Sequence, residues 1–87
     1  MKKPVVKTMK IRVDVMPKEG VLDPQGKAIS HALATLGFKG VEDVRAGKVI
    51  VLEVAEKNRE KAVESAKSMA EKLLANQVIE DYRVSVL

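Results

Sequence analysis

The chain has 87 residues, which is the size of one small domain with a single hydrophobic core. Hydrophobic residues make up 46% of it and charged residues 32%, a balance typical of a folded globular chain. The absence of cysteine excludes disulfides, thiolate metal sites and cysteine nucleophiles. The longest unbroken apolar run, residues 49–52, is far shorter than the ~20 residues of a membrane helix. No secretory signal is recognisable either, so we expect a cytoplasmic protein.

The basic excess lies at the N-terminus. Sixteen Lys and Arg residues against twelve Asp and Glu residues give a net charge of +4. Lys2, Lys3 and Lys7 carry three of these positive charges, and the first eight residues contain no acid. Without them the net charge is +1, which argues against nucleic acid as a partner of the domain. We expect residues 1–8 to form a basic, disordered extension and residues 9–87 to form one domain.

The first predicted element is a strand that begins at Met9. Apolar and polar residues alternate from there to residue 16, which is the pattern of a half-buried strand. Pro17 ends it by removing a backbone donor. Residues 18–22 follow as a loop.

A helix is predicted to begin after Asp23. Asp23 is a good N-cap, and Pro24 suits the first helical position. An apolar stripe with helical spacing follows, formed by Ile29, Ala32, Leu33 and Leu36. Gly37 is expected to end the helix in a left-handed conformation, with Phe38 packed against Leu33 as in a Schellman motif.

The second half of the chain predicts more strand and a second helix. Residues 41–54 indicate extended structure, either a hairpin of residues 41–45 and 49–54 that turns at residues 46–48, or one long bent strand. Asn58 is placed to cap the second helix, and Asn76 to close it. The apolar stripe of this helix is formed by Val63, Ala66, Met69, Ala70, Leu73 and Leu74. Residues 80–86 predict the last strand.

This order of elements predicts a fold class. Strand, helix, strand, strand, helix and strand make the ferredoxin-like βαββαβ unit, an α+β fold whose antiparallel sheet carries both helices on one face. The strand at residues 49–54 is apolar on both sides, since Val49 and Val51 face away from the predicted core. A one-sided sheet should be polar there. We therefore expect self-association through the sheet at Val49 and Val51.

Few residues suggest catalysis or small-ligand chemistry. The single histidine, His31, has no second histidine or cysteine with which to bind a metal. The serines lie in patterned elements without a neighbouring base, and no glycine-rich phosphate loop is present. The two aromatic residues, Phe38 and Tyr82, are too few for stacking of RNA bases. A ferredoxin-like regulatory module that binds a small molecule stays open as an alternative.

Three stretches together resemble one family. They are KEGVLDPQGKA at residues 18–28, VEDVRAGK at residues 41–48 and KLLANQVIEDY at residues 72–82. In this order they are similar to the PurS family, the small subunits of phosphoribosylformylglycinamidine (FGAM) synthase. The resemblance covers nearly the whole domain, from residue 9 to residue 86.

The resemblance implies a role in purine synthesis. The complete enzyme converts formylglycinamide ribonucleotide (FGAR), glutamine, ATP and water to FGAM, glutamate, ADP and phosphate. The family implies a homodimer or dimer of dimers that bridges a glutaminase, PurQ, and a synthetase, PurL, and assists ammonia transfer between them. It implies no catalytic residue, metal or cofactor in this subunit, with ATP and magnesium bound by the synthetase. No nucleic acid or membrane is expected as a partner.

We expect the partner contacts to lie on loops, where binding residues concentrate. Asp23 and Gly26 also have a local explanation as parts of a helix start, although Gly26 costs a helix about 1 kcal/mol and suggests a close approach by a partner backbone. Asn76 has an alternative role as a helix stop, and Arg45 and Lys48 as a solvated strand end. The candidates are Lys18, Glu19, Gly20, Asp23, Gln25, Gly26, Arg45, Lys48, Asn76 and Tyr82.

Overall fold

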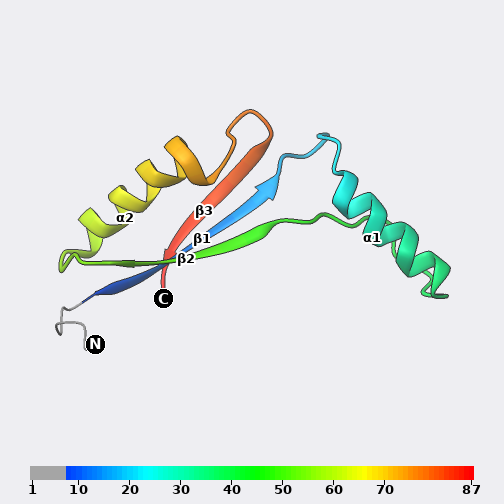
Figure 1. Cartoon of the computed structure of the whole chain (residues 1–87), viewed down its shortest axis with the longest axis horizontal. Coiled ribbons are helices and arrows are strands. Elements are labelled where there is room, and N and C mark those ends of the chain that lie inside the picture. The colour runs from blue at the N-terminus through cyan, green and yellow to red at the C-terminus, as the bar shows by residue number, and fades with distance from the viewer. Residues whose placement is uncertain (1–7) are drawn as a thin grey trace, which may run out of the picture.

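The computed structural model describes residues 8–87, so the predicted extension lies outside the described residues except for Thr8. Three strands form one antiparallel sheet in the order β2-β1-β3 (Figure 1). The elements in chain order are β1 (Met9–Pro17), α1 (Pro24–Thr35), β2 (Lys48–Val54), α2 (Arg59–Met69), η1 (Ala70–Leu74) and β3 (Glu80–Val86). The α+β class with an antiparallel sheet is therefore confirmed. Within residues 8–87, no helix is long and apolar enough to cross a membrane.

The central strand β1 supplies the core. Ile11, Val13 and Val15 are fully buried, because the alternation predicted from the sequence points them all toward α2. Ala62 and Ala66 of α2 and Ala70 of η1 are fully buried against them. Small side chains on the helix let its backbone approach the sheet closely. Half-buried residues of all three strands surround this centre, among them Leu52, Tyr82 and Val84.

The beginning of α2 and the end of α1 follow the predicted signals. The Asn58 side chain accepts a hydrogen bond from the Lys61 N–H at 3.1 Å and caps α2. Gly37 has a φ of +93°, and the N–H groups of Gly37 and Phe38 donate to the carbonyls of Ala34 and Leu33 at 3.0 Å. These are the two bonds of a Schellman motif, so the predicted end of α1 is confirmed.

The end of the second helical segment differs from a plain α-helix. The last turn, η1, is a five-residue π-helix, and the Ala75 N–H donates to the Ala70 carbonyl at 2.9 Å. Ala75 is already extended, so the helix ends before Asn76. Asn76 is therefore not the residue that stops the helix.

Neither alternative for residues 41–54 is correct. Residues 41–47 have no regular secondary structure, and the strand begins only at Lys48. The hairpin is absent because the backbone of residues 44–46 contacts the start of α1 and not a neighbouring strand. Within the described part of the chain, β2 consequently has a strand neighbour on one side only.

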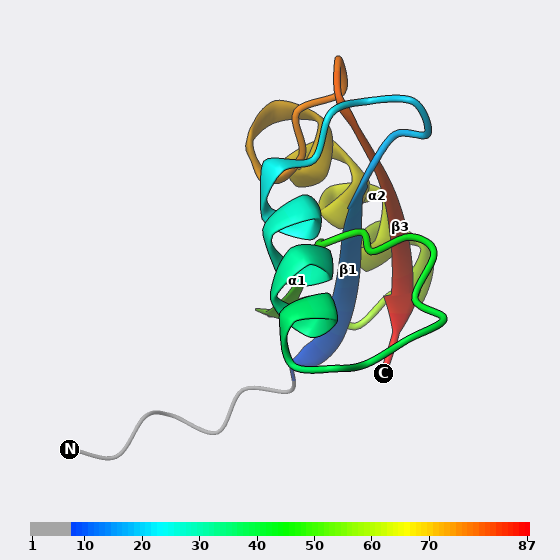
Figure 2. The same ribbon diagram turned by 90° about the vertical axis from the view of Figure 1, so that its right-hand side faces the viewer.

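The position of α1 also differs from the predicted arrangement, in which both helices lie on one face of the sheet. Only α2 packs on the sheet, over β1 and β3, whereas α1 extends beyond the end of the sheet and makes few contacts with the other elements (Figures 1 and 2). The radius of gyration is 17.2 Å, compared with about 12 Å for a compact chain of this length. We call residues 24–47, α1 and its return segment, the arm.

The two ends of the domain lie together. The Leu87 N–H donates to the Lys10 carbonyl at 3.0 Å, which holds the C-terminus beside the beginning of β1 (Figure 1). The connections 18–23 and 75–79 lie at the other end of the strands. The sheet thus has a terminal end and an end formed by loops.

Close packing of α2 on β1 gives a first prediction. Replacing Ala66 by Leu puts a larger side chain where no space is available, and we expect a loss of about 1–3 kcal/mol in the free energy of unfolding. Ala28→Leu, at an exposed helical position, is the matched control and should change it by less than about 0.5 kcal/mol. Urea unfolding of both variants measures the difference, and equal midpoints would contradict this packing.

Candidate functional site

Three connections meet at one end of the sheet. Because β1 runs antiparallel to both neighbours, the end of β1 at Pro17 lies beside the beginnings of β2 at Lys48 and β3 at Glu80. We call this region, residues 18–23, 41–47 and 75–79, the loop end. The sequence placed candidate residues in or beside each of these segments separately. The structure brings them into one surface.

The side chain of Asp23 joins the first turn of α1 to the return segment near Ala46. Its Oδ1 accepts a hydrogen bond from the Gly26 N–H at 2.9 Å, which is the predicted N-cap. Its Oδ2 accepts a second from the Ala46 N–H at 2.8 Å, twenty-three residues later in the chain. The N–H groups of Gly26 and Ala46 lower the pKa of the Asp23 carboxyl below its ordinary value of 3.8, because they stabilise the charged form. The tie to Ala46 was not predicted.

A contact within the chain itself requires a glycine at position 26. Gly26 is the one buried residue of α1. A Cβ at this position would come closer than 3.0 Å to the carbonyl oxygen of Val44 and to Asp23. The glycine therefore lets residues 44–46 pass close to the first turn of the helix. The close backbone approach expected at Gly26 is thus made by the chain itself, and a partner contact at this residue stays a prediction.

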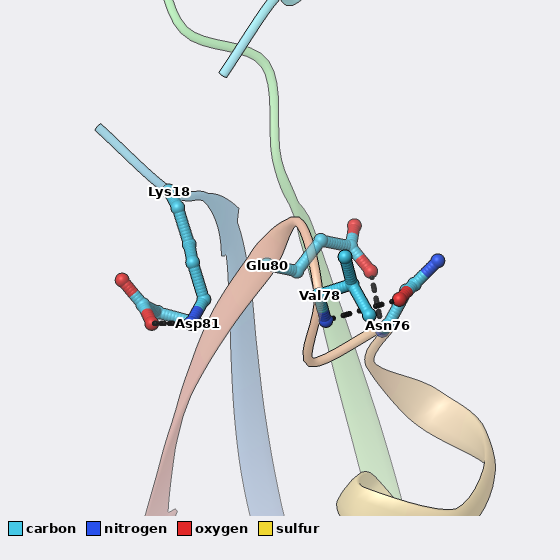
Figure 3. Close-up of polar contacts among 5 residues, drawn as sticks. All are labelled: Lys18, Asn76, Val78, Glu80 and Asp81. Carbon is cyan, nitrogen blue, oxygen red and sulfur yellow. Dashed lines mark hydrogen bonds and ion pairs between the residues drawn. The ribbon is translucent and has the colours of Figure 1, made fainter. Parts of the chain in front are cut away.

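The first and third segments are joined through Lys18. Its backbone N–H donates to the Ile79 carbonyl at 2.8 Å. Its ammonium lies 3.8 Å from the Asp81 carboxylate, as Figure 3 shows. The ion pair is solvent-exposed, so it contributes little to stability. The backbone bond holds the two connections beside each other.

Asn76 organises the turn before β3. Its side-chain oxygen accepts from the Val78 N–H at 3.1 Å, and its own N–H donates to the Glu80 carboxylate at 2.7 Å (Figure 3). Its carbonyl also accepts from the N–H groups of Ile79 and Glu80. This is the turn chemistry of an asparagine, which satisfies nearby backbone donors itself. Asn76 thus shapes the loop end from within.

Tyr82 connects β3 with the second helical segment. Its ring packs against the core, and its hydroxyl donates to the Glu71 carboxylate at 2.8 Å. This hydrogen bond, followed by partial desolvation and the negative charge of Glu71, raises the pKa of the tyrosine above 10.0. No sequence pattern predicts the pairing with Glu71, because the two residues lie eleven positions apart in different elements.

The other candidates present side chains or backbone to solvent. Lys18 is half-buried, whereas Glu19, Gln25, Arg45 and Lys48 are exposed. Gly20 has a φ of +82°, which a tight turn requires. A shallow hollow of about 160 Å³ collects charges of both signs, from Lys18, Glu19, Asp23, Lys27, Asp43 and Arg45.

A second hollow, lined by apolar and polar residues, lies beside this one. It has a volume of about 360 Å³ and contains the exposed side chains of Leu22 and Ile79. In residues 8–87, no group of three or more acidic or histidine side chains is placed to hold a metal ion. Apolar and charged side chains next to each other, on loops joined by hydrogen bonds, are suited to recognition of a protein surface.

The open face of the sheet carries the predicted self-association residues. Val49 and Val51 are 54% and 53% exposed, on the face opposite α2. Their neighbours on β1 are Asp14 and Arg12, whose side chains form a 2.9 Å ion pair. The face therefore combines an apolar edge with a charged centre.

Comparison with known proteins identifies the family. The family model for PurS, phosphoribosylformylglycinamidine (FGAM) synthase, matches residues 10–87. The PurS subunit of this synthase from Bacillus subtilis is 51% identical over 77 residues, which cover 88% of this chain and 90% of the relative. The chain belongs to the PurS family. The resemblance found in the three sequence stretches is confirmed.

Solved PurS structures share the fold. The chain in the structure of PurLQS from Thermotoga maritima is 40% identical and superimposes with a TM-score of 0.83, covering 93% of this chain and 99% of that one. Methanocaldococcus jannaschii PurS, described as one subunit of formylglycinamide ribonucleotide amidotransferase, is 43% identical with a TM-score of 0.79. That match covers 91% of this chain and 95% of the relative.

The close passage at Gly26 gives a second prediction. Gly→Ala inside a helix is ordinarily stabilising by about 1 kcal/mol. Here the added methyl displaces Val44, and we expect Gly26→Ala to lower the free energy of unfolding by about 1–3 kcal/mol. The neighbouring exposed control, Gln25→Ala, should leave it within about 0.5 kcal/mol. A stabilised Gly26→Ala variant in thermal unfolding would contradict the contact.

The Asp23 tie gives a third, pH-dependent prediction. Because the folded-state pKa lies below the ordinary value, the contribution of the carboxylate is present above pH 3.8 and is lost as pH falls through the folded pKa. The stability advantage of the parent protein over Asp23→Asn should therefore be constant near neutral pH and shrink below pH 3.8. Asp43→Asn, which changes an exposed carboxyl in residues 41–47, is the control. An advantage that persists in strong acid would contradict the assignment.

Proposed function

We propose that this chain is the non-catalytic assembly subunit of FGAM synthase and bridges the glutaminase and the synthetase. The observation that supports this most strongly is the loop end. Three connections that are distant in sequence are held together by Asp23 and Lys18, while Asn76 shapes the third of them. They present charged and apolar side chains on one surface. A rigid surface of this kind recognises partners without reacting groups.

The proposal has a chemical reason. The complex would convert ATP, FGAR, glutamine and water to ADP, phosphate, FGAM and glutamate. Ammonia released from glutamine must reach the synthetase before it is protonated in water, since ammonium is not a nucleophile. A subunit that seals the junction between two enzymes keeps water out and so preserves the nucleophile.

Relatives support the choice of partners. A homologous chain lies in the T. maritima PurLQS structure, alongside the PurL and PurQ proteins that give that complex its name. We propose the same two kinds of partner here, with ATP and magnesium bound by the synthetase. The exposed Val49 and Val51 favour a homodimer or a dimer of dimers. Since ATP and glutamine are cytoplasmic metabolites, we expect the complex in the cytoplasm.

Reconstitution tests the proposal. We expect the purified chain alone to turn over nothing, and its addition to the synthetase and glutaminase to restore FGAM formation from glutamine, whereas formation from added ammonia should not require it. Unchanged glutamine-dependent rates would contradict the role. Saturable binding of a small metabolite to the isolated chain would favour the regulatory-module alternative.

Charge reversal at the loop end refines the test. Arg45→Glu should raise the subunit concentration that gives half-maximal activity by on the order of tenfold, which corresponds to about 1.4 kcal/mol of binding. Lys57→Glu is the matched control, because Lys57 is exposed in the connection at the opposite end of β2. Equal effects of the two variants would place the contact elsewhere.

A further inference from the structure

The turn between η1 and β3 carries an exposed apolar side chain. Val78 is 82% exposed, and the turn projects beyond the ends of the strands at the loop end (Figures 1 and 2). We call residues 76–79 the tip turn. A valine this exposed contributes little to folding, because apolar side chains stabilise a fold through burial. Single exposed apolar residues are common, so the way in which this one is held decides what it can do.

Hydrogen bonds within the chain hold the tip turn in one shape. The Val78 N–H donates to Oδ1 of Asn76 at 3.1 Å (Figure 3). The N–H groups of Ile79 and Glu80 donate to the Asn76 carbonyl at 3.0 and 2.7 Å, and the Ile79 carbonyl accepts from Lys18. A surface that is already ordered loses little conformational freedom when it binds. The tip turn is therefore preorganised to present Val78.

The charged side chains around the tip turn are engaged within the chain. The Glu80 carboxylate accepts from a backbone N–H of the turn at 2.7 Å. The Glu71 carboxylate accepts from the Tyr82 hydroxyl at 2.8 Å, and Asp81 lies 3.8 Å from the Lys18 ammonium. Because these charges already have partners, the tip turn offers another molecule chiefly its apolar side chain. The surface that fits it is apolar and not oppositely charged.

Exposed apolar side chains continue from the tip turn to the neighbouring connection. Ile79 is exposed, Leu22 is 69% exposed, and both line the second hollow. The mixed-charge hollow that contains Arg45 is a separate feature of the loop end. The loop end thus has two regions of different chemistry, one apolar and convex and one charged and concave.

We propose that the tip turn inserts Val78 into an apolar pocket of one of the two partner enzymes. The inference rests on the proposed bridging function and assigns the apolar part of that contact to this turn. A projecting side chain requires a concave partner surface, since well-packed interfaces are complementary in shape. Salt screens a contact between exposed charges and hardly affects apolar burial. A second copy of this chain is the competing occupant.

A substitution that preserves shape tests the insertion. Val78→Thr replaces one methyl group by a hydroxyl and should raise the subunit concentration for half-maximal glutamine-dependent activity on the order of tenfold, because the pocket gives the hydroxyl no partner. Binding to the purified synthetase and to the purified glutaminase, measured separately, should weaken equally for one enzyme and stay unchanged for the other. Thermal unfolding of the variant should match the parent, since Val78 is exposed.

Leu87→Ala is the matched control, because Leu87 is an exposed apolar residue at the opposite end of the sheet. It should leave activity and both binding constants unchanged. Parent-like activity and binding of Val78→Thr overturn the insertion while the bridging function stands. A parent chain that does not restore glutamine-dependent activity overturns both.

Salt dependence and self-association test the kind of partner. The effect of Val78→Thr should be the same at about 0.05 M and about 0.5 M salt, whereas the effect of Arg45→Glu should shrink at the higher concentration. An effect of Val78→Thr that disappears in high salt overturns the apolar pocket. Sedimentation of the variant alone should match the parent, and a weakened self-association would assign the tip turn to a second copy and overturn the proposal.

Discussion

The structure depends on one carboxylate that accepts two backbone donors. Asp23 caps α1 through the Gly26 N–H and holds the return segment through the Ala46 N–H. This single side chain determines where the arm leaves the sheet and where residues 44–46 run. The glycine beside it allows the two segments to touch. Without this tie, neither the direction of α1 nor the course of its return segment would be fixed, because few other contacts connect the arm to the sheet.

Local signals predicted the elements well, since each depends on neighbours in sequence. The alternation of β1, the cap at Asn58 and the left-handed end at Gly37 all occur as expected. The prediction of a strand at residues 41–45 was wrong. A strand needs a neighbouring strand to pair with, whereas this segment contacts Asp23 and Gly26 instead. Periodicity likewise shows which face of α1 is apolar, but not what covers that face.

In the candidate site, too, local features could be predicted from the sequence and contacts between distant segments could not. The loops that carry Lys18, Arg45 and Asn76 could be chosen from sequence, since turns and charged residues mark them. Their convergence could not, because it follows from strand order and from bonds such as that between Lys18 and Ile79. Asp23 and Asn76 proved to shape the surface from within, whereas the side chains of Arg45 and Lys48 are exposed on it. The pairing of Tyr82 with Glu71 had no sequence signal.

The hydrogen bond from Leu87 to Lys10 has a practical consequence for work on this protein. It places the C-terminus next to the first strand, at the opposite end of the sheet from the loops. An affinity tag, fluorophore or immobilising linker attached after Leu87 therefore leaves the loops facing solution. Surface-based assays with the larger enzymes should accordingly be built on a C-terminal attachment.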